Sequence, residues 1–369
     1  MSQEQVPADG PRRPRRSFVR RHLALTSLLA IVVVIVVVVG GYLWWLNHQL
    51  SNIQRFDAGI HPAHVAPKAQ AGKSDPQPVS NTPLNILLLG ADNGGKNQQS
   101  VGQDLKDGVW TPGIHRSDTI MLVHVTANRK SVQIVSIPRD TWLKVPGYPY
   151  DGGYAKINAA FSYGGPKLSV KVVQHLTGIH IDHVAIIDWS GFKDLTNALG
   201  GITVYVPHTF YDDSQKITWH KGWQTLDGYR ALQYVRTRHG LSNGDFGRIM
   251  RQQNFMRAVM DKLLSEGTMS NPIKITRVVG VMVKYLILDK TWTNSEIRDL
   301  ALSMRHLHSS DVKFTTAPLG TYATVDGQDV VELNAVKCKK LWRDLADGHL
   351  GRYLRANPGS SLASQTNVN

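Results

Sequence analysis

Carboxylates and arginines recur in short polar motifs through the middle of this 369-residue chain. Carboxylate oxygens suit a hard divalent cation, and the planar guanidinium group of arginine suits phosphate oxygens. The motifs are Leu-Leu-Leu-Gly-Ala-Asp ending at Asp92, Arg116-Ser-Asp-Thr, Ser136-Ile-Pro-Arg-Asp-Thr, Lys156-Ile-Asn-Ala-Ala, Arg236-Thr-Arg and Asp245-Phe-Gly-Arg-Ile-Met-Arg-Gln-Gln. As a set they predict a site that binds a diphosphate together with a metal ion.

Two aspartates could hold that metal ion. Asp92 comes after the apolar run Leu84–Leu89, and Asp118 comes just before the apolar run Thr119–Val125. If these runs are neighbouring strands, both carboxylates reach one edge of a sheet. Mg²⁺ typically takes one or two carboxylates and completes its shell with water and phosphate oxygens, and Mn²⁺ accepts similar ligands. Each aspartate alone could also be an ordinary turn or cap residue.

Arg139 follows the strand-like run Val132–Ile137, so it lies where ligand crevices form in open α/β sheets. Arginines that converge without a counter-charge repel one another, by roughly 4 kcal/mol for a pair 4 Å apart at an effective dielectric of 20. A bound diphosphate would make the net electrostatic interaction among these arginines favourable. Carboxylate partners such as Asp140 and Asp245 are the alternative.

Four further residues come in two pairs. Arg248 and Gln252 are four residues apart, so a helix carries them on one face, where both can reach the same ligand. Arg236 and Arg238 are two apart and share a face only in an extended segment. This spacing predicts that the preceding helix ends near Tyr234.

Other patterns in the sequence are weaker. Gly90–Lys96 has the spacing of a phosphate-binding loop, but Asn97 stands where Ser or Thr should bind the metal. An exposed loop over Asn93–His115 is therefore the favoured interpretation. Two histidine pairs lack the third ligand of a zinc site. They are His61 with His64 and His180 with His183.

The N-terminus predicts attachment to a membrane. Residues 23–45 contain no charged side chain and end in two tryptophans, and about 20 apolar residues suffice to cross a bilayer as a helix. A cleavable signal peptide would have an apolar region of only about 7 to 15 residues. Residues 1–22 carry six arginines against two acidic residues, so they should stay in the cytoplasm. The rest of the chain is then expected to be extracytoplasmic.

Residues 46–83 are polar and contain five prolines, which predicts an extracytoplasmic linker. Apolar runs typical of strands covered on both faces then alternate with helix-like stretches, which predicts an α/β fold, a three-layer α/β/α sandwich around a mixed sheet. We expect this domain over residues 84–350 and a disordered tail over residues 351–369. The expected strands are 84–89, 119–125, 132–137, 184–187, 202–206 and 312–316, and the expected helices are 167–176, 192–199, 229–234, 246–264, 273–286 and 294–307.

The chain is basic, with a formal net charge of +14 and a pI of about 9.8. Outside a membrane, anionic lipid headgroups and cell-wall polymers are the favoured partners, and nucleic acid is disfavoured. With 42% hydrophobic residues the chain can bury a full core, which excludes disorder of the whole chain. Its single cysteine, Cys338, cannot form an intramolecular disulfide, so that core must stabilise the fold.

The motifs as a set resemble the LytR-CpsA-Psr family of Gram-positive bacteria. Arg116-Ser-Asp-Thr, Ser136-Ile-Pro-Arg-Asp-Thr, Lys156-Ile-Asn-Ala-Ala, Arg236-Thr-Arg and Arg248-x-x-Arg-Gln-Gln occur in that family's order. The short basic N-terminus and the single span resemble the family as well. The resemblance covers about residues 84–264.

This resemblance implies a phosphotransferase that moves a glycan phosphate from an undecaprenyl diphosphate carrier to peptidoglycan, thereby attaching a teichoic acid, capsule or arabinogalactan-like polymer. It implies that Asp92 and Asp118 bind Mg²⁺. The implied diphosphate-binding residues are Arg139, Lys156, Arg236, Arg238, Arg248 and Gln252. The alternatives are a polyprenyl diphosphate phosphatase, in which water replaces the acceptor, and a non-catalytic protein that binds the lipid diphosphate or the wall.

Overall fold

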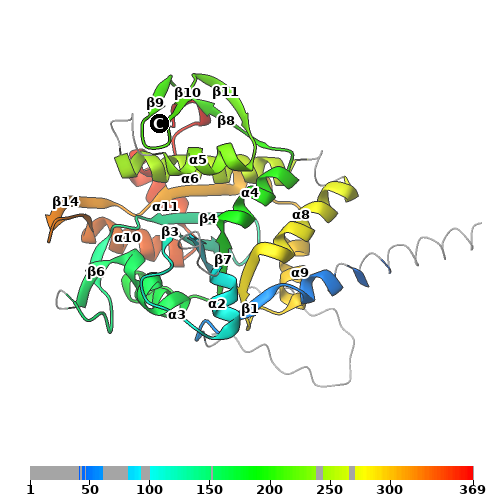
Figure 1. Cartoon of the computed structure of the whole chain (residues 1–369), viewed down its shortest axis with the longest axis horizontal. Helices are drawn as coiled ribbons and strands as arrows, with labels where there is room; N and C mark the ends of the chain where they lie inside the picture. Colours follow the sequence, from blue (N-terminus) through cyan, green and yellow to red (C-terminus); the bar gives the residue numbers. More distant parts are fainter. Residues whose placement is uncertain are drawn as a thin grey trace, which may run out of the picture. The chain divides into compact units, whose positions relative to one another are not determined.

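The computed structural model describes residues 41, 44–45, 47–60, 82–92, 100–150, 153–237, 244–265 and 271–368 (Figure 1). Its contacts divide the chain into residues 1–50 and residues 51–369, and the fold below is that of the second unit. The predicted span over residues 23–45 lies almost entirely outside the described residues. Within them, no helix has both the length and the apolar character needed to cross a membrane.

A mixed seven-stranded sheet forms the centre of the second unit, in the order β1-β12-β7-β2-β3-β4-β13. These strands are β1 (Gln54–Phe56), β12 (Leu286–Asp289), β7 (His183–Asp188), β2 (Leu84–Ala91), β3 (Ser117–Val125), β4 (Val132–Ile137) and β13 (Val312–Thr316). The pairs β1–β12, β7–β2 and β4–β13 are parallel, and the other three are antiparallel. The prediction of a mixed sheet is confirmed.

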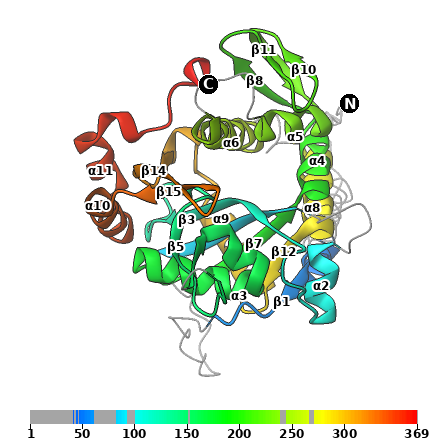
Figure 2. The same ribbon diagram turned by 60° about the vertical axis from the view of Figure 1, so that its left-hand side comes forward.

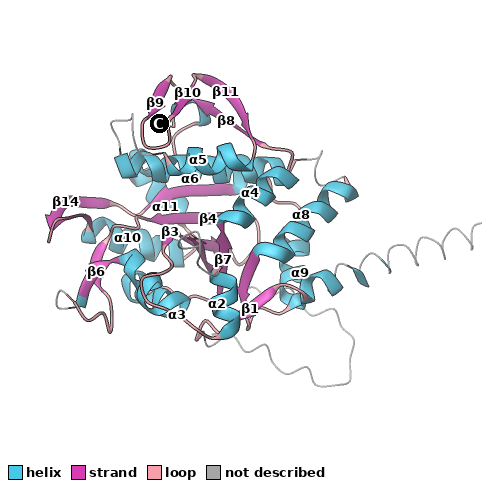
Figure 3. Cartoon of the chain, viewed as in Figure 1, coloured by secondary structure: helices cyan, strands magenta, loops and turns pink. Residues whose placement is uncertain are grey.

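Helices cover both faces of this sheet, as Figures 1 and 3 show. One face packs against α3 (Ile157–Thr177), α10 (Ala335–Ala346) and α11 (Leu350–Ala356). The buried core between them includes Leu87, Leu122 and Val135 from the strands, together with Phe161 and Leu341 from the helices. Every residue of β4 is buried, as its continuous apolar run predicts.

The other face lies beneath α6 (Gly244–Leu263), on the side opposite α3 in both Figure 1 and Figure 2. Helix α6 is flanked by three further helices, which are α4 (Trp189–Ala198), α5 (Gly228–Arg236) and α8 (Pro272–Tyr285). A second buried core joins these helices to the strand pairs β8–β11 (Ile202–Val206 with Gly222–Leu226) and β9–β10 (Phe210–Asp212 with Ile217–Trp219). The predicted three layers are therefore present.

The remaining elements lie around these layers. They are α2 (Val101–Asp107), β5 (Trp142–Lys144), β6 (Tyr154–Lys156), α9 (Asn294–Ser303), β14 (Leu319–Val325), β15 (Gln328–Leu333) and the short helices η2 (Ser309–Asp311), η3 (Pro358–Ser360) and η4 (Gln365–Asn367).

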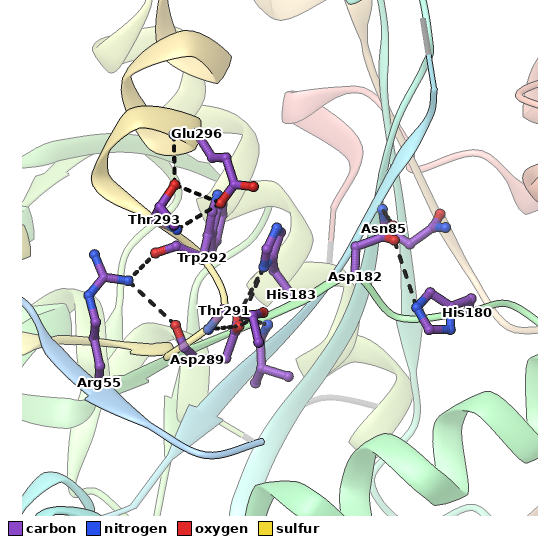
Figure 4. Close-up of polar contacts among 11 residues, drawn as sticks. Arg55, Asn85, His180, Asp182, His183, Asp289, Thr291, Trp292, Thr293 and Glu296 are labelled. Atoms are coloured by element: carbon purple, nitrogen blue, oxygen red, sulfur yellow. Dashed lines mark hydrogen bonds and ion pairs between the residues drawn. The ribbon is translucent and has the colours of Figure 1, made fainter. Parts of the chain in front are cut away.

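The linker predicted over residues 46–83 is wrong for residues 51–60. These residues contain β1, which pairs with β12 at the sheet edge, and they bury Phe56, Ala58 and Ile60 in the main core. Arg55 on β1 donates hydrogen bonds to the carbonyl oxygens of Asp289, at 3.5 Å, and of Trp292 (Figure 4). A three-residue strand leaves no periodic signal, and its partner strand lies far along the chain. Residues 61–81 of the predicted linker lie outside the described residues.

The disordered tail predicted over residues 351–369 is wrong as well. Most of α11 falls within it, and Tyr353 and Val368 are fully buried. Ser361 forms a β-bridge with Thr315 of β13, the edge strand opposite β1. This segment is polar in sequence, so the few apolar side chains that anchor it gave no recognisable pattern.

Candidate functional site

Two neighbouring strands bring Asp92 and Asp118 to one end of the sheet. β2 and β3 are antiparallel, so the end of one lies beside the start of the other, with Ala91 opposite Ser117. Beyond that pair, Asp92 N donates to Arg116 O at 2.9 Å, and Arg116 N donates to Asp92 Oδ1 at 2.7 Å. The prediction that adjacent strands bring Asp92, just past one strand, and Asp118, at the start of the other, to one edge of the sheet is confirmed.

A cavity of about 610 Å³ opens at this end of the sheet. It is lined by Asp92, Arg116, Asp118, Arg139, Trp189, Ser214, Gln215, Arg236, Arg248 and Gln252. Six of the eight predicted site residues are in this lining. Four arginines face two aspartates, a surplus of two positive charges, so the cavity suits an anion.

Asp140 lies at the centre of a charged network at the cavity wall. Arg139 donates to Asp118 Oδ1 and, through Nε, to Asp140 Oδ2 at 3.3 Å. Lys156 Nζ lies 3.1 Å from Asp140 Oδ1. For Arg139 the alternative to a bound diphosphate is therefore present, because the carboxylates of Asp118 and Asp140 compensate its positive charge.

Lys156 lies apart from the other predicted residues. It lines a smaller adjoining cavity of about 280 Å³, which shares Arg116 and Arg139 with the larger one. Arg238 lies outside the described residues. The structure therefore brings together the two predicted aspartates, three of the four predicted arginines and the glutamine.

Arg236 is the last residue of α5, so the helix extends two residues beyond the predicted end at Tyr234. Its guanidinium lies over the ring of Trp189, 4.0 Å from the centroid, in a cation–π contact. Trp189 opens α4, whose N-cap Asp188 accepts a hydrogen bond from Gly191 N at 2.7 Å. No sequence motif marks Trp189 as a site residue, because a single tryptophan at a helix start usually belongs to the core.

Helix α6 carries Arg248 and Gln252 to the cavity on one face, as their spacing predicts. Arg248 is only 4% exposed, and Gln252 Nε2 donates to Val235 O at 3.4 Å. Arg251 is not among the residues that line the cavity, and it donates to Thr237 O. Burial lowers the pKa of Arg251 to about 10. Neighbouring arginines on this helix thus have different environments.

A tight turn between β9 and β10 places Ser214 and Gln215 at the cavity. Buried Asp212 accepts hydrogen bonds from Ser214 Oγ at 2.6 Å, Gln215 N at 3.1 Å and Gln215 Nε2 at 3.1 Å. Burial would raise the pKa of Asp212, but these hydrogen bonds and one from Thr237 outweigh it, so its pKa lies below the usual value. No motif in the sequence predicts this turn.

The exposed loop predicted over Asn93–His115 is wrong for residues 101–107, which form α2 after a Ser100 N-cap. His115 is fully buried, with Nε2 2.8 Å from Asp104 Oδ2 and Nδ1 3.3 Å from Asp92 O. This contact ties α2 to the backbone of Asp92. Most of the loop-like Gly90–Lys96 motif lies outside the described residues.

The donor set of the cavity can be compared with the needs of Mg²⁺. Among the described residues, no group of three or more His, Cys, Asp or Glu side chains could hold a metal ion. Asp92 and Asp118 nevertheless line one cavity, and each makes its hydrogen bond there through Oδ1. Because Mg²⁺ needs only one or two carboxylates when phosphate and water complete its shell, this pair fits the ion.

A mixed sheet with helices on both faces and an arginine- and aspartate-lined cavity at one end defines an α/β sandwich suited to an anionic ligand. The LytR_cpsA_psr family model matches residues 58–347, and the chain belongs to that family.

Characterised relatives resemble parts of the chain. It is 33% identical over 255 residues to the probable cell wall biosynthesis protein LcpB of Corynebacterium glutamicum, covering 67% of this chain and 58% of LcpB. It is 34% identical over 220 residues to the polyisoprenyl-teichoic acid–peptidoglycan teichoic acid transferase TagV of Bacillus subtilis, covering 58% of this chain and 53% of TagV. The chain thus spans between half and three-fifths of the length of these relatives.

Solved structures share the fold. The crystal structure of B. subtilis TagV is 28% identical with a TM-score of 0.58, covering 73% of this chain and 98% of that one. A structure of TagT bound to LIIa-WTA is 27% identical with a TM-score of 0.54, covering 76% of this chain and 95% of that one.

Proposed function

We propose that this chain is a membrane-anchored, extracytoplasmic phosphotransferase that moves a glycan phosphate from a polyprenyl diphosphate carrier to peptidoglycan. The observation that carries this proposal is the convergence of four arginines and two aspartates in one cavity. Two further facts support it: relatives are named polyisoprenyl-teichoic acid–peptidoglycan teichoic acid transferases, and TagT has been solved bound to LIIa-WTA. The transferred polymer would be a teichoic acid, a capsule or an arabinogalactan-like glycan.

The cavity residues would hold the diphosphate by charge. Arg139, Arg236, Arg248 and Gln252 line the cavity and can donate to phosphate oxygens. Each charge-assisted hydrogen bond can contribute about 1.5 to 3 kcal/mol, which offsets the repulsion between converging guanidinium groups. Lys156 would reach the sugar-proximal phosphate from the adjoining cavity, and Arg238 belongs to the same proposed set.

Asp92 and Asp118 would hold Mg²⁺, or Mn²⁺, which when bound would neutralise charge on the diphosphate. The protein residues position the two substrates. A muramic-acid hydroxyl attacks the phosphorus nearest the sugar, a new P–O bond forms, and the P–O bond to the lipid phosphate breaks. The lipid monophosphate leaves, and the hydroxyl proton passes to a carboxylate such as Asp92 and then to water.

The polyprenyl chain would lie on the sheet face beneath α6. Leu88, Val123 and Ile187 share that face by strand register, and all three are only partly buried. Gln253 of α6 donates to Ser136 Oγ at 2.8 Å on the same face, which fixes the helix above it. The predicted span over residues 23–45 would keep the domain beside the bilayer that supplies this lipid.

The test is transfer by the full-length protein in detergent, supplied with a lipid diphosphate-linked sugar, Mg²⁺ and peptidoglycan oligomers. Mass spectrometry should detect the phosphodiester adduct. Arg139→Ala and Asp118→Asn should lower its formation by about 10²- to 10³-fold. Arg230→Ala is the matched control, since Arg230 packs over Trp219 outside the cavity.

Two outcomes would contradict the proposal. Release of phosphorylated sugar without an adduct would indicate a phosphatase. Lipid diphosphate binding that is unaffected by Asp118→Asn, without turnover, would indicate a non-catalytic binding protein.

A further inference from the structure

Three adjoining cavities lie at the proposed site. The large cavity and the 280 Å³ cavity share Arg116 and Arg139 as a common wall. Trp142 in turn lines both the 280 Å³ cavity and a groove of about 710 Å³. The proposed diphosphate cavity therefore adjoins the smaller cavity, which in turn adjoins the groove at Trp142.

The chemistry of the lining changes along this path. The large cavity is dominated by arginines, whereas the small one adds the neutral polar groups of Tyr148, Asn158, Ser162 and Gln328. The groove is mainly apolar and aromatic, and its charged lining residues are Glu332, Lys339 and Arg343. Neutral hydroxyls and amides beside aromatic rings suit a sugar, which offers hydroxyl groups at its edge and C–H groups on its faces.

The hairpin β5–β6 forms a platform at this transition. Trp142 lies opposite Lys156 and Lys144 lies opposite Tyr154, so all four side chains belong to one face of the hairpin. The rings of Trp142 and Tyr154 stack with centroids 6.4 Å apart and planes 26° apart. Tyr154 is 45% exposed, and neither ring belongs to the buried core. Their exposure gives the platform an outward-facing aromatic surface.

We propose that the small cavity and the groove form an acceptor subsite for a peptidoglycan glycan strand, with a sugar ring against Trp142 and Tyr154. This inference rests on the proposed transferase function. In phosphoryl transfer the attacking and leaving oxygens lie roughly in line, so the acceptor must approach from the side opposite the lipid phosphate. The small cavity adjoins the proposed diphosphate cavity at Arg116 and Arg139, so an acceptor bound there would lie next to the reacting phosphate. In the groove, Lys339 and Arg343 outnumber the single acidic residue Glu332, so its net charge complements the carboxylates of muramic acid and its peptide.

Direct binding tests the subsite without any turnover. Full-length protein is titrated, in the absence of lipid donor, with soluble oligosaccharides of alternating N-acetylglucosamine and N-acetylmuramic acid, by calorimetry. Trp142→Ala should weaken binding about tenfold, and Trp142→Phe should retain most of it. Trp223→Ala is the matched control, because Trp223 is 57% exposed on β11 and lines none of the three cavities. Tyr154→Ala replaces Trp142→Ala if that variant fails to fold.

The transfer assay supplies a second readout. Trp142→Ala should raise the KM for the acceptor about tenfold and leave the KM for the lipid donor unchanged. Wild-type acceptor binding and acceptor KM in Trp142→Ala, with transfer intact, would overturn the subsite and leave the transferase function standing. Tryptophan-dependent glycan binding without any transfer would support the subsite and overturn the function. Loss of binding in Trp223→Ala alone would place the glycan elsewhere.

Discussion

Two charged regions of this protein are built on opposite principles. At the end of the sheet where β7 begins and β12 ends, shown in Figure 4, Asp289 is 0% exposed. It accepts hydrogen bonds from Val184 N at 2.9 Å and Thr291 N at 3.0 Å, lies 3.2 Å from His183 Nδ1, and also accepts from Thr291 Oγ1. The ring of His183 stacks on Trp292, with centroids 4.6 Å apart. This cluster is closed and internally satisfied.

The pKa of Asp289 reflects that closure. Burial would raise it, but hydrogen bonds from His183, Thr291 and Val184 outweigh burial, so the pKa lies below the usual value. The carboxylate therefore stays ionised and holds β7 to β12. The nitrogen of His183 that faces Asp289 is engaged in this structural contact.

The cavity at the end of β2 and β3 is the open counterpart. Its lining has a surplus of positive charge, and Arg236 faces the ring of Trp189 there. Such an arrangement gains little for folding but gains much from a bound polyanion. The comparison teaches that charge density alone does not mark a functional site. A net charge in the lining of an open cavity is the better indicator.

We expect substitutions in the closed cluster around Asp289 to reduce the free energy of unfolding more than substitutions at the cavity do. We expect Asp289→Ala to lower the free energy of unfolding by about 3 to 5 kcal/mol, because it leaves buried donors without their acceptor. Urea denaturation measures the change. Asp118→Ala, in the half-buried pair with Arg139, should change it by less than about 1 kcal/mol. Equal losses in the two variants would refute the distinction between the regions.

Acid should destabilise the end of the sheet opposite the cavity, where His124 of β3 lies opposite Asn85 of β2. His124 Nδ1 donates to Asn85 Oδ1 at 2.7 Å, and burial together with nearby Arg129 lowers the pKa of His124 from 6.5 to about 4. Between pH 6.5 and 4 the unfolded chain binds a proton that the folded chain does not, so stability falls as pH falls. The contribution is at most roughly 3 kcal/mol. It is fully present above pH 6.5.

Substitution sharpens this pH test. His124→Gln should flatten the dependence of the free energy of unfolding on pH between 6.5 and 4, measured by urea titrations at several pH values. His308→Gln, at a side chain that is 80% exposed, should leave the slope unchanged. An unaltered slope in His124→Gln would show that His124 is not the group responsible.

At the cavity, we expect a substitution to reduce transfer activity while leaving the stability of the fold almost unchanged. Arg236→Ala is expected to lower transfer about 100-fold through the loss of a phosphate donor, while the free energy of unfolding changes by no more than about 1 kcal/mol, the contribution of the cation–π contact with Trp189. Arg230→Ala removes an arginine from the same helix that also packs on a tryptophan, but outside the cavity. Similar losses of transfer in both variants would argue against a specific role for Arg236.

The smallest expected effect concerns the aromatic support of Arg236. Trp189→Leu removes the cation–π contact, which contributes about 0.5 to 1 kcal/mol at such a site. Binding of a lipid diphosphate should weaken by about two- to fivefold, as measured by calorimetry. No change in affinity would mean that other contacts fix the guanidinium.

The sequence alone determined the layers and much of the site. Strands β4 and β8 have the predicted bounds, because continuous apolar runs between turn residues have few other structures available. The sequence also placed Asp92 after β2, Asp118 at the start of β3, and Arg248 and Gln252 on one face of α6, because strand ends and helical periodicity are set locally. The roles of these residues in binding and transfer stay predictions.

Tertiary structure decided the features that depend on distant partners. Strand β1 exists because Gln54 pairs opposite Ile287, and the C-terminal segment is ordered because Ser361 bridges to Thr315. Trp189 became part of the site only when α4 and α5 packed together. Such contacts depend on long-range packing, which leaves no periodic pattern in the segments that it orders. For the same reason, folding decides whether a charged cluster is closed or left open beside a cavity.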